Sequence, residues 1–93
     1  MARQGSRVAE KIGERLRTAR QAAGLTQLEL ANLAGVDPSG LQSYESGRAA
    51  PNIGSLIRLG AALAIDPGDF LRDLTTTDLP SRDVRSDGRR RRA

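Results

Sequence analysis

The stretch that decides the fold runs from Thr26 to Glu45 and reads TQLELANLAGVDPSGLQSYE. Thr26 followed three residues later by Glu29 has the form of a capping box, which begins a helix. Gly35 tolerates the positive φ that ends such a helix. Asp37–Pro38 then begins another helix, with an N-cap acid and a proline in the first helical position. The stretch therefore predicts two short helices joined by a tight turn.

Apolar residues within this stretch stand where two crossing helices need them. In the first helix, which ends near Ala34, Leu30 faces the core and Ala31 is small where the second helix crosses over it. In the second helix, Leu41 and Tyr44 face inward three residues apart, as helical periodicity requires. Two helices joined by a tight glycine-containing turn form the helix-turn-helix motif, and the offsets of these residues fit it.

Three further helices are expected around this pair. Apolar residues recur at helical spacing over residues 9–23, which predicts an amphipathic first helix. Asn52 is placed to cap a fourth helix that runs through Ala64, and Asp66–Pro67 begins a short fifth helix. We therefore expect an all-α, compact five-helix domain over residues 9–74, with the helix-turn-helix formed by its second and third helices.

The composition argues against most kinds of catalytic and metal site. The chain contains no His and no Cys, which removes the usual general base, the thiol nucleophile and nearly every zinc site. Asp66, Asp69 and Asp73 share a helical face, but capping and surface charge explain them better than a metal does. No apolar run exceeds the five residues of Ala61–Ile65. We expect no enzymatic activity, no metal, no cofactor, no membrane association and a cytoplasmic location.

The positive charge of the chain lies in its flanks. Residues 9–74 hold seven basic and eight acidic side chains, a net charge of −1. Residues 1–8 add two arginines, and we expect them to form a flexible basic arm. Residues 75–93 hold six arginines, three aspartates and few large apolar residues, so we expect a disordered arginine-rich tail. Arg89–Arg92 fit either a solubilising tail or non-specific attraction to phosphate.

Taken together, these motifs resemble the Cro/C1-type, or XRE-like, helix-turn-helix family between Ile12 and Leu71. The resemblance is carried by the approach from Arg20 to Gln27, Leu30–Ala31, Gly35–Val36, Glu45-x-Gly47–Arg48, Pro51, Leu63 and Phe70–Leu71. It implies a lambda-repressor-like fold and a double-stranded DNA partner.

The resemblance also implies roles for individual residues. Gln27 matches a family position that contacts a DNA phosphate and supports the recognition helix. That helix would lie in the major groove. Its outward residues are Pro38, Ser39, Gln42 and Ser43. Arg48 and the backbone N–H groups near Asn52 match phosphate contacts. Arg20 and Glu45 match an ion pair that ties the first helix to the end of the third.

Some residues depart from the family pattern. Pro38 offers a base only an apolar surface, and Gly40 costs the recognition helix about 1 kcal/mol relative to Ala while presenting nothing to a base. We therefore expect modest direct readout, supplemented by phosphate contacts, DNA shape and a second subunit. Leu28 and Leu33 occupy positions that the family leaves polar. They form either a contact for a protein partner or tolerated surface leucines.

The resulting expectation is a sequence-specific DNA-binding transcriptional regulator, a repressor associated with the nucleoid. It would bind a palindromic operator as a homodimer, with half-sites about 34 Å apart or a multiple of that. By resemblance to family members, the dimer face would be the fifth helix, with Leu71 and Leu74. Two alternatives stay open. One is an antitoxin that binds DNA and a protein toxin, and the other is a protein-interaction or RNA-binding adaptor without DNA readout.

Overall fold

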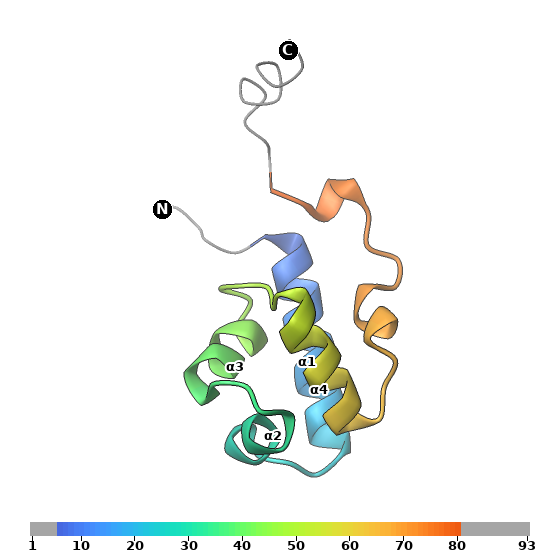
Figure 1. Ribbon diagram of the computed structural model, residues 1–93. Coiled ribbons are helices and arrows are strands. Elements are labelled where there is room, and N and C mark those ends of the chain that lie inside the picture. The colour runs from blue at the N-terminus through green and yellow to red at the C-terminus, as the bar shows by residue number, and fades with distance from the viewer. Residues whose placement is uncertain (1–5, 81–93) are drawn as a thin grey trace, which may run out of the picture.

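The structure is a computed structural model, and it describes residues 6–80. Within this range the chain forms four α-helices followed by two short 3-10 helices, without a strand. The elements are α1 (Arg7–Ala22), α2 (Gln27–Ala34), α3 (Pro38–Glu45), α4 (Ile53–Leu63), η1 (Pro67–Leu71) and η2 (Thr76–Asp78) (Figure 1). The fold is therefore all-helical, as the sequence predicts, with four α-helices in place of the expected five.

The expected fifth helix is a 3-10 helix, η1, and the expectation of an α-helix there is wrong. Asp66 caps η1, and Pro67 occupies its first position, so the predicted start is correct. The element ends at Leu71 because Arg72 leaves helical geometry with a ψ of 133° and Asp73 has a φ of +66°. Short 3-10 helices of this kind commonly serve as connectors, and η1 has only five residues.

α1 begins at Arg7, two residues before the expected start. Ser6 caps it, because the Ser6 side chain accepts a hydrogen bond from the Ala9 N–H at 3.1 Å. Arg7 and Val8 therefore belong to a helix and not to the flexible arm expected over residues 1–8. Residues 1–5 of that arm lie outside the described residues.

The helix-turn-helix forms as predicted. The Thr26 hydroxyl accepts from the Glu29 N–H at 3.0 Å, and the Glu29 carboxylate accepts from the Thr26 N–H at 2.9 Å, which completes the capping box. Gly35 ends α2 with a φ of +72°, in the left-handed region where a Cβ is costly. Asp37 then caps α3.

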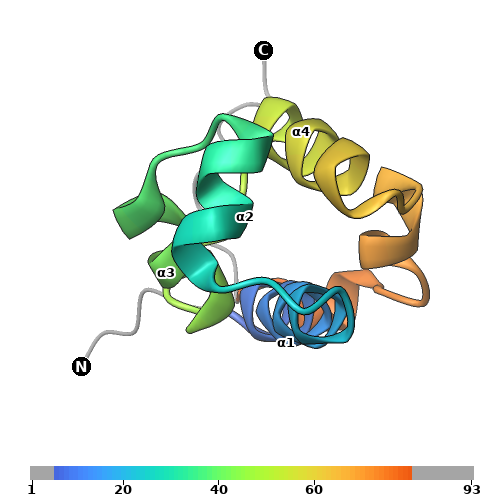
Figure 2. The same ribbon diagram turned by 90° about the horizontal axis from the view of Figure 1, so that it is seen from below.

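The helices enclose one apolar core. Figure 2 shows α1, α2, α4 and η1 arranged around the middle of the domain, which the core side chains fill. Four leucines are fully buried there: Leu16, Leu30, Leu41 and Leu59. Burying a leucine side chain stabilises the folded state by about 1.5–3 kcal/mol. Each of the four α-helices contributes one such leucine to the core. Phe70 closes the core from η1.

The C-terminal end of α3 packs closely on α1 at Gly13. A Cβ at this position would lie 2.3 Å from the Tyr44 carbonyl oxygen and 3.0 Å from that of Glu45. Gly47 makes a second close approach, since a Cβ there would lie 3.2 Å from the Glu10 Cα atom. These backbone contacts fix the orientation of α3 relative to α1.

The chain continues in folded form beyond residue 74. Thr75 and Asp78 form a capping box around η2, and Asp78 is buried. The expectation of disorder from Thr75 onward is therefore wrong for residues 75–78, because a local cap and a contact with α1 order this segment. Residues 81–93, which include Arg89–Arg92, lie outside the described residues. No helix between residues 6 and 80 is long and apolar enough to cross a membrane.

Candidate nucleic-acid interface

A buried carboxylate at the end of α3 joins this helix to α1 and α2. The Glu45 carboxylate accepts from Arg20 Nε at 2.7 Å and from Arg20 Nη2 at 3.0 Å, so the expected ion pair forms with bidentate geometry. Gln27 Nε2 donates to the same carboxylate at 3.0 Å, and Arg20 Nη1 donates to the Leu25 carbonyl oxygen at 2.8 Å. The end of α1, the start of α2 and the end of α3 therefore share one polar cluster.

Burial makes this cluster important for stability. The Glu45 side chain is 2% exposed and the Arg20 side chain 13%. The hydrogen bonds that Arg20 donates to Glu45 raise the pKa of Arg20 above its ordinary value. Removing one partner of such a buried pair typically costs about 3–5 kcal/mol, because the other charge is left without compensation.

Gln27 has one amide N–H in this cluster. A glutamine amide carries two N–H donors, and the half-exposed Gln27 therefore keeps a second donor besides the one held by Glu45. The hydrogen bond to Glu45 agrees with the expected role of Gln27 in supporting α3. The second N–H is available to a phosphate oxygen. The phosphate contact itself stays a prediction.

The outward face of α3 is open to a partner along its length. Pro38, Ser39 and Gln42 are exposed and Ser43 is half-buried, whereas Leu41 and Glu45 face the interior. The structure thus brings the four expected base-reading residues to one accessible helix.

Asp37 controls the donor available at Ser39. Its carboxylate accepts from the Ser39 hydroxyl and from the Gly40 N–H, the latter at 3.0 Å. These hydrogen bonds lower the pKa of Asp37 below its ordinary value, and the bond from the Ser39 hydroxyl has the largest effect. With its proton donated to Asp37, the Ser39 hydroxyl offers a base its lone pairs only. Sequence reasoning treats Asp37 as a cap alone, although its position two residues before Ser39 was the available signal.

The segment after α3 supplies the other expected phosphate contacts. Arg48 is exposed, and its backbone is held by a hydrogen bond to the Ser43 carbonyl oxygen at 3.0 Å. The Asn52 side chain accepts from the Ser55 N–H at 2.7 Å and so caps α4. Because this oxygen is occupied, a phosphate near Asn52 would meet backbone N–H groups in the first turn of α4.

The remaining sequence-derived candidates lie wholly or partly on the surface. Asp66, Asp69 and Asp73 do not gather into a metal-binding group, and no group of three such ligands occurs between residues 6 and 80. Leu28 and Leu33 are exposed on α2. Of the two residues expected at the dimer face, Leu71 is exposed and Leu74 is half-buried.

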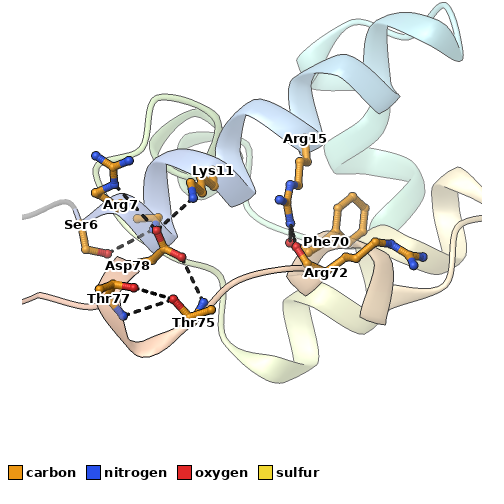
Figure 3. A network of polar contacts seen from close by, with 10 residues as sticks. Ser6, Arg7, Lys11, Arg15, Phe70, Arg72, Thr75, Thr77 and Asp78 are labelled. Atoms are coloured by element: carbon orange, nitrogen blue, oxygen red, sulfur yellow. Dashed lines mark hydrogen bonds and ion pairs between the residues drawn. The ribbon is translucent and has the colours of Figure 1, made fainter.

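A second polar network, which sequence reasoning missed, joins α1 to the C-terminal segment, defined here as residues 72–78. Lys11 and Arg7 pair with Asp78, and Arg15 donates to the carbonyl oxygens of Phe70 and Arg72 (Figure 3). Two signals were available: the capping-box spacing of Thr75 and Asp78, and the recurrence of basic residues every four positions along α1.

Comparison with known proteins identifies related chains. A family model described as "Helix-turn-helix" matches residues 16–70, more than half of the chain. Multiprotein-bridging factor 1 of Candida albicans is 41% identical over 54 residues, which are 58% of this chain and 36% of that protein. The chain therefore spans about a third of the length of this curated relative.

Solved structures match over a larger share of their length. The restriction-modification controller protein C.AhdI of Aeromonas hydrophila is 37% identical, with a TM-score of 0.64 over 67% of this chain and 94% of that one. SinR of Bacillus subtilis, solved in complex with DNA, is 34% identical, with a TM-score of 0.63 over 64% of this chain and 97% of that one. In the SinR–SinI complex the match has 30% identity and a TM-score of 0.65, over 86% of this chain and 75% of that one.

The match to the family model includes α2, the turn at Gly35 and α3, the elements that carry the exposed candidate residues. Sequence identity above 30% to chains covered almost completely accompanies this match. The protein belongs to the Cro/C1-type helix-turn-helix family.

Proposed function

We propose that the protein is a sequence-specific DNA-binding transcriptional regulator that places α3 in the major groove. The observation that carries this proposal is that α3 is packed rigidly on one side and exposed on the other. Its inner side is fixed by the close contact at Gly13 and by the buried cluster at Glu45, while its outer face presents exposed Ser39 and Gln42. A rigidly held helix with a polar outer face is what reading of base edges requires.

The residues divide into readers and positioning contacts. Gln42 is the reader with bidentate capacity, which suits the N6 and N7 atoms of adenine. Ser39 acts as an acceptor, and Ser43 reads a neighbouring base. Gln27, Arg48 and the first turn of α4 near Asn52 contact phosphates and set the register of the domain on the duplex.

One such domain reads few base pairs, so the protein acts as a homodimer on a palindromic operator. The half-sites lie about 34 Å apart or a multiple of that. It represses transcription by occupying this operator, and it has no enzymatic role. SinR, solved with DNA, supports the DNA-binding part of this proposal. Its site of action is the cytoplasmic nucleoid.

Selection of random duplex DNA by the purified protein at about 0.15 M salt tests this function, since specific binding exceeds non-specific binding by about 10³-fold or more under such conditions. We expect a palindrome whose half-sites repeat at one spacing. Recovery of no sequence above background would contradict operator binding.

A second candidate function is binding of a protein partner through α2. Leu28 and Leu33 are both exposed on this helix, and SinR was solved in complex with the SinI protein. An antitoxin or an adaptor would use such a surface. Co-purification with the product of a neighbouring gene, abolished in a Leu28→Ser/Leu33→Ser variant, would favour this function. Retention of the same product by the variant would exclude this surface.

A further inference from the structure

Basic residues form a stripe along one face of α1. Arg7, Lys11 and Arg15 are spaced four residues apart, and residues four apart on a helix lie above one another. All three side chains contact the C-terminal part of the chain (Figure 3). The C-terminal part of the chain therefore contacts each of the three basic residues of this stripe.

Asp78 holds the N-terminal half of this stripe. Its carboxylate lies 2.9 Å from Lys11 Nζ and 3.7 Å from Arg7 Nε, and it accepts a hydrogen bond from the Thr75 N–H at 3.0 Å. The Asp78 side chain is 9% exposed. Two cations and one N–H around an anionic oxygen group would suit a phosphate as well as a carboxylate.

Arg15 holds the beginning of the segment in a different way. Its Nη1 donates to the carbonyl oxygens of Phe70 at 2.9 Å and Arg72 at 2.8 Å. These contacts anchor the segment without neutralising the guanidinium. The charge that the segment neutralises is therefore at Lys11 and Arg7.

The stripe lies close to the segment that is expected to contact phosphate. Glu10, between Arg7 and Lys11 in α1, lies against Gly47, and the exposed Arg48 follows directly. Figure 1 shows the α3–α4 connection passing beside the first turns of α1. A duplex that contacts Arg48 is thus close to the N-terminal end of the stripe.

We propose that Lys11 and Arg7 form a second contact surface for the DNA phosphate backbone, and that Asp78 occupies it in competition with the duplex. This inference rests on the proposed DNA-binding function. The Lys11 side chain is 37% exposed and that of Arg7 69%. Asp78 itself is buried, but both cations remain in contact with water, so they can exchange the carboxylate for another anion at little cost. A polyanion can therefore displace the Asp78 carboxylate, and the C-terminal segment limits the non-specific affinity of the domain.

The test compares Asp78→Asn with Asp73→Asn in the full chain, using a random-sequence duplex at 50–200 mM salt. Both substitutions remove one negative charge from the same segment. Asp73 is exposed and makes no ion pair within residues 6–80, and its φ of +66° suits Asn. Each phosphate contact contributes about 0.9 to the slope of log K against log salt. We expect Asp78→Asn to steepen the slope by about 0.9–1.8 relative to Asp73→Asn.

Over this range of salt, that steepening means an additional decrease in affinity of about 3- to 12-fold. Thr75→Ala changes no charge but removes the hydroxyl that caps η2, so it provides an independent release of the segment. We expect it to steepen the slope in the same direction. Far-UV circular dichroism establishes that each variant is folded.

The Lys11→Gln substitution tests whether Lys11 is the cation that contacts the duplex when Asp78 is replaced. In the wild-type chain, where Asp78 covers Lys11, this substitution should change the slope little. In the Asp78→Asn chain it should remove at least half of the steepening. Equal slopes for Asp78→Asn and Asp73→Asn, or no measurable binding by Asp78→Asn, would overturn the inference. Loss of sequence preference in the selection experiment would instead contradict the proposed function, since the salt slope on random DNA does not depend on base readout.

Discussion

The crossing of α1 over the end of α3 predicts that Gly13→Ala destabilises the protein. An added Cβ would lie 2.3 Å from the Tyr44 carbonyl oxygen. Carbon–oxygen contacts of this kind normally lie at about 3.3–3.6 Å, so the two backbones must separate by about 1 Å. Overpacking of this size costs typically 1–3 kcal/mol, and the obstruction is backbone that cannot rotate away as a side chain can.

Gly54→Ala is the matched control for this substitution. Gly54 is also helical, but it is exposed, and the nearest atom to an added Cβ is the Asn52 side-chain oxygen at 3.5 Å. Replacing glycine by alanine inside a helix otherwise stabilises by about 0.5–1 kcal/mol. We therefore expect Gly54→Ala to raise the free energy of unfolding and Gly13→Ala to lower it.

Urea and thermal denaturation followed by far-UV circular dichroism measure both variants. The melting temperature should change by about 4–8 °C for each kcal/mol in a domain of this size. If Gly13→Ala proved as stable as Gly54→Ala, the close crossing would be refuted, and with it the conclusion that α1 fixes the orientation of α3.

Four further predictions concern the polar contacts, base reading and the charge distribution. Glu45→Ala leaves a buried guanidinium without its acceptor and should lower the free energy of unfolding by about 3–5 kcal/mol in urea denaturation, whereas a decrease below 1 kcal/mol would mean that the cluster is solvated. The pKa values of Asp37 and Asp78 are lowered by folding, so their stabilisation is present above the unfolded pKa near 3.8 and is lost as the pH falls through the folded values. The melting temperature should therefore decrease when the pH is lowered below about 4, and the decrease should be smaller in Asp78→Asn. Equal dependence of the melting temperature on pH in the two proteins would contradict a stabilising role of the Asp78 carboxylate. Ser43→Ala should relax preference at individual base pairs without changing the salt slope, while deletion of Arg89–Arg92 should lower the slope by about 0.9 for each DNA phosphate that these arginines neutralise; an unchanged slope would mean that they only solubilise.

Local signals in the sequence predict most helix boundaries. The capping box at Thr26, the left-handed Gly35 and the Asp37–Pro38 start each act within a few residues, so they can be recognised without tertiary information. The start of α1 was missed although the same kind of signal, a serine N-cap at Ser6, was present.

Features that depend on distant contacts were not predictable. Gly13 is an ordinary helical glycine in the sequence, and its role appears only where the end of α3 lies against it. The composition of residues 75–93 indicates disorder, but Asp78 meets Lys11 across 67 positions of sequence, and that contact orders residues 75–78. Composition averages over a segment and does not detect one buried carboxylate.

The candidate site likewise has features that the sequence predicts and features that depend on contacts in the folded chain. The resemblance predicts the positions of Arg20, Gln27 and Glu45, and the structure joins these residues in one cluster. It does not predict that the Ser39 hydroxyl donates its hydrogen bond to Asp37, because this contact depends on side-chain geometry at the N-terminus of α3.

We propose that the outer face of α3 reads DNA sequence. The most direct measurement compares binding of the wild type and of Gln42→Ala to the selected duplex and to a scrambled duplex, at one salt concentration. We predict a wild-type preference of at least about 10³-fold, reduced in Gln42→Ala by about 5- to 150-fold, which corresponds to 1–3 kcal/mol, with affinity for the scrambled duplex unchanged. Equal affinity of the wild type for both duplexes would contradict base reading by α3. So would a preference for the selected duplex that neither Gln42→Ala nor Ser43→Ala reduces.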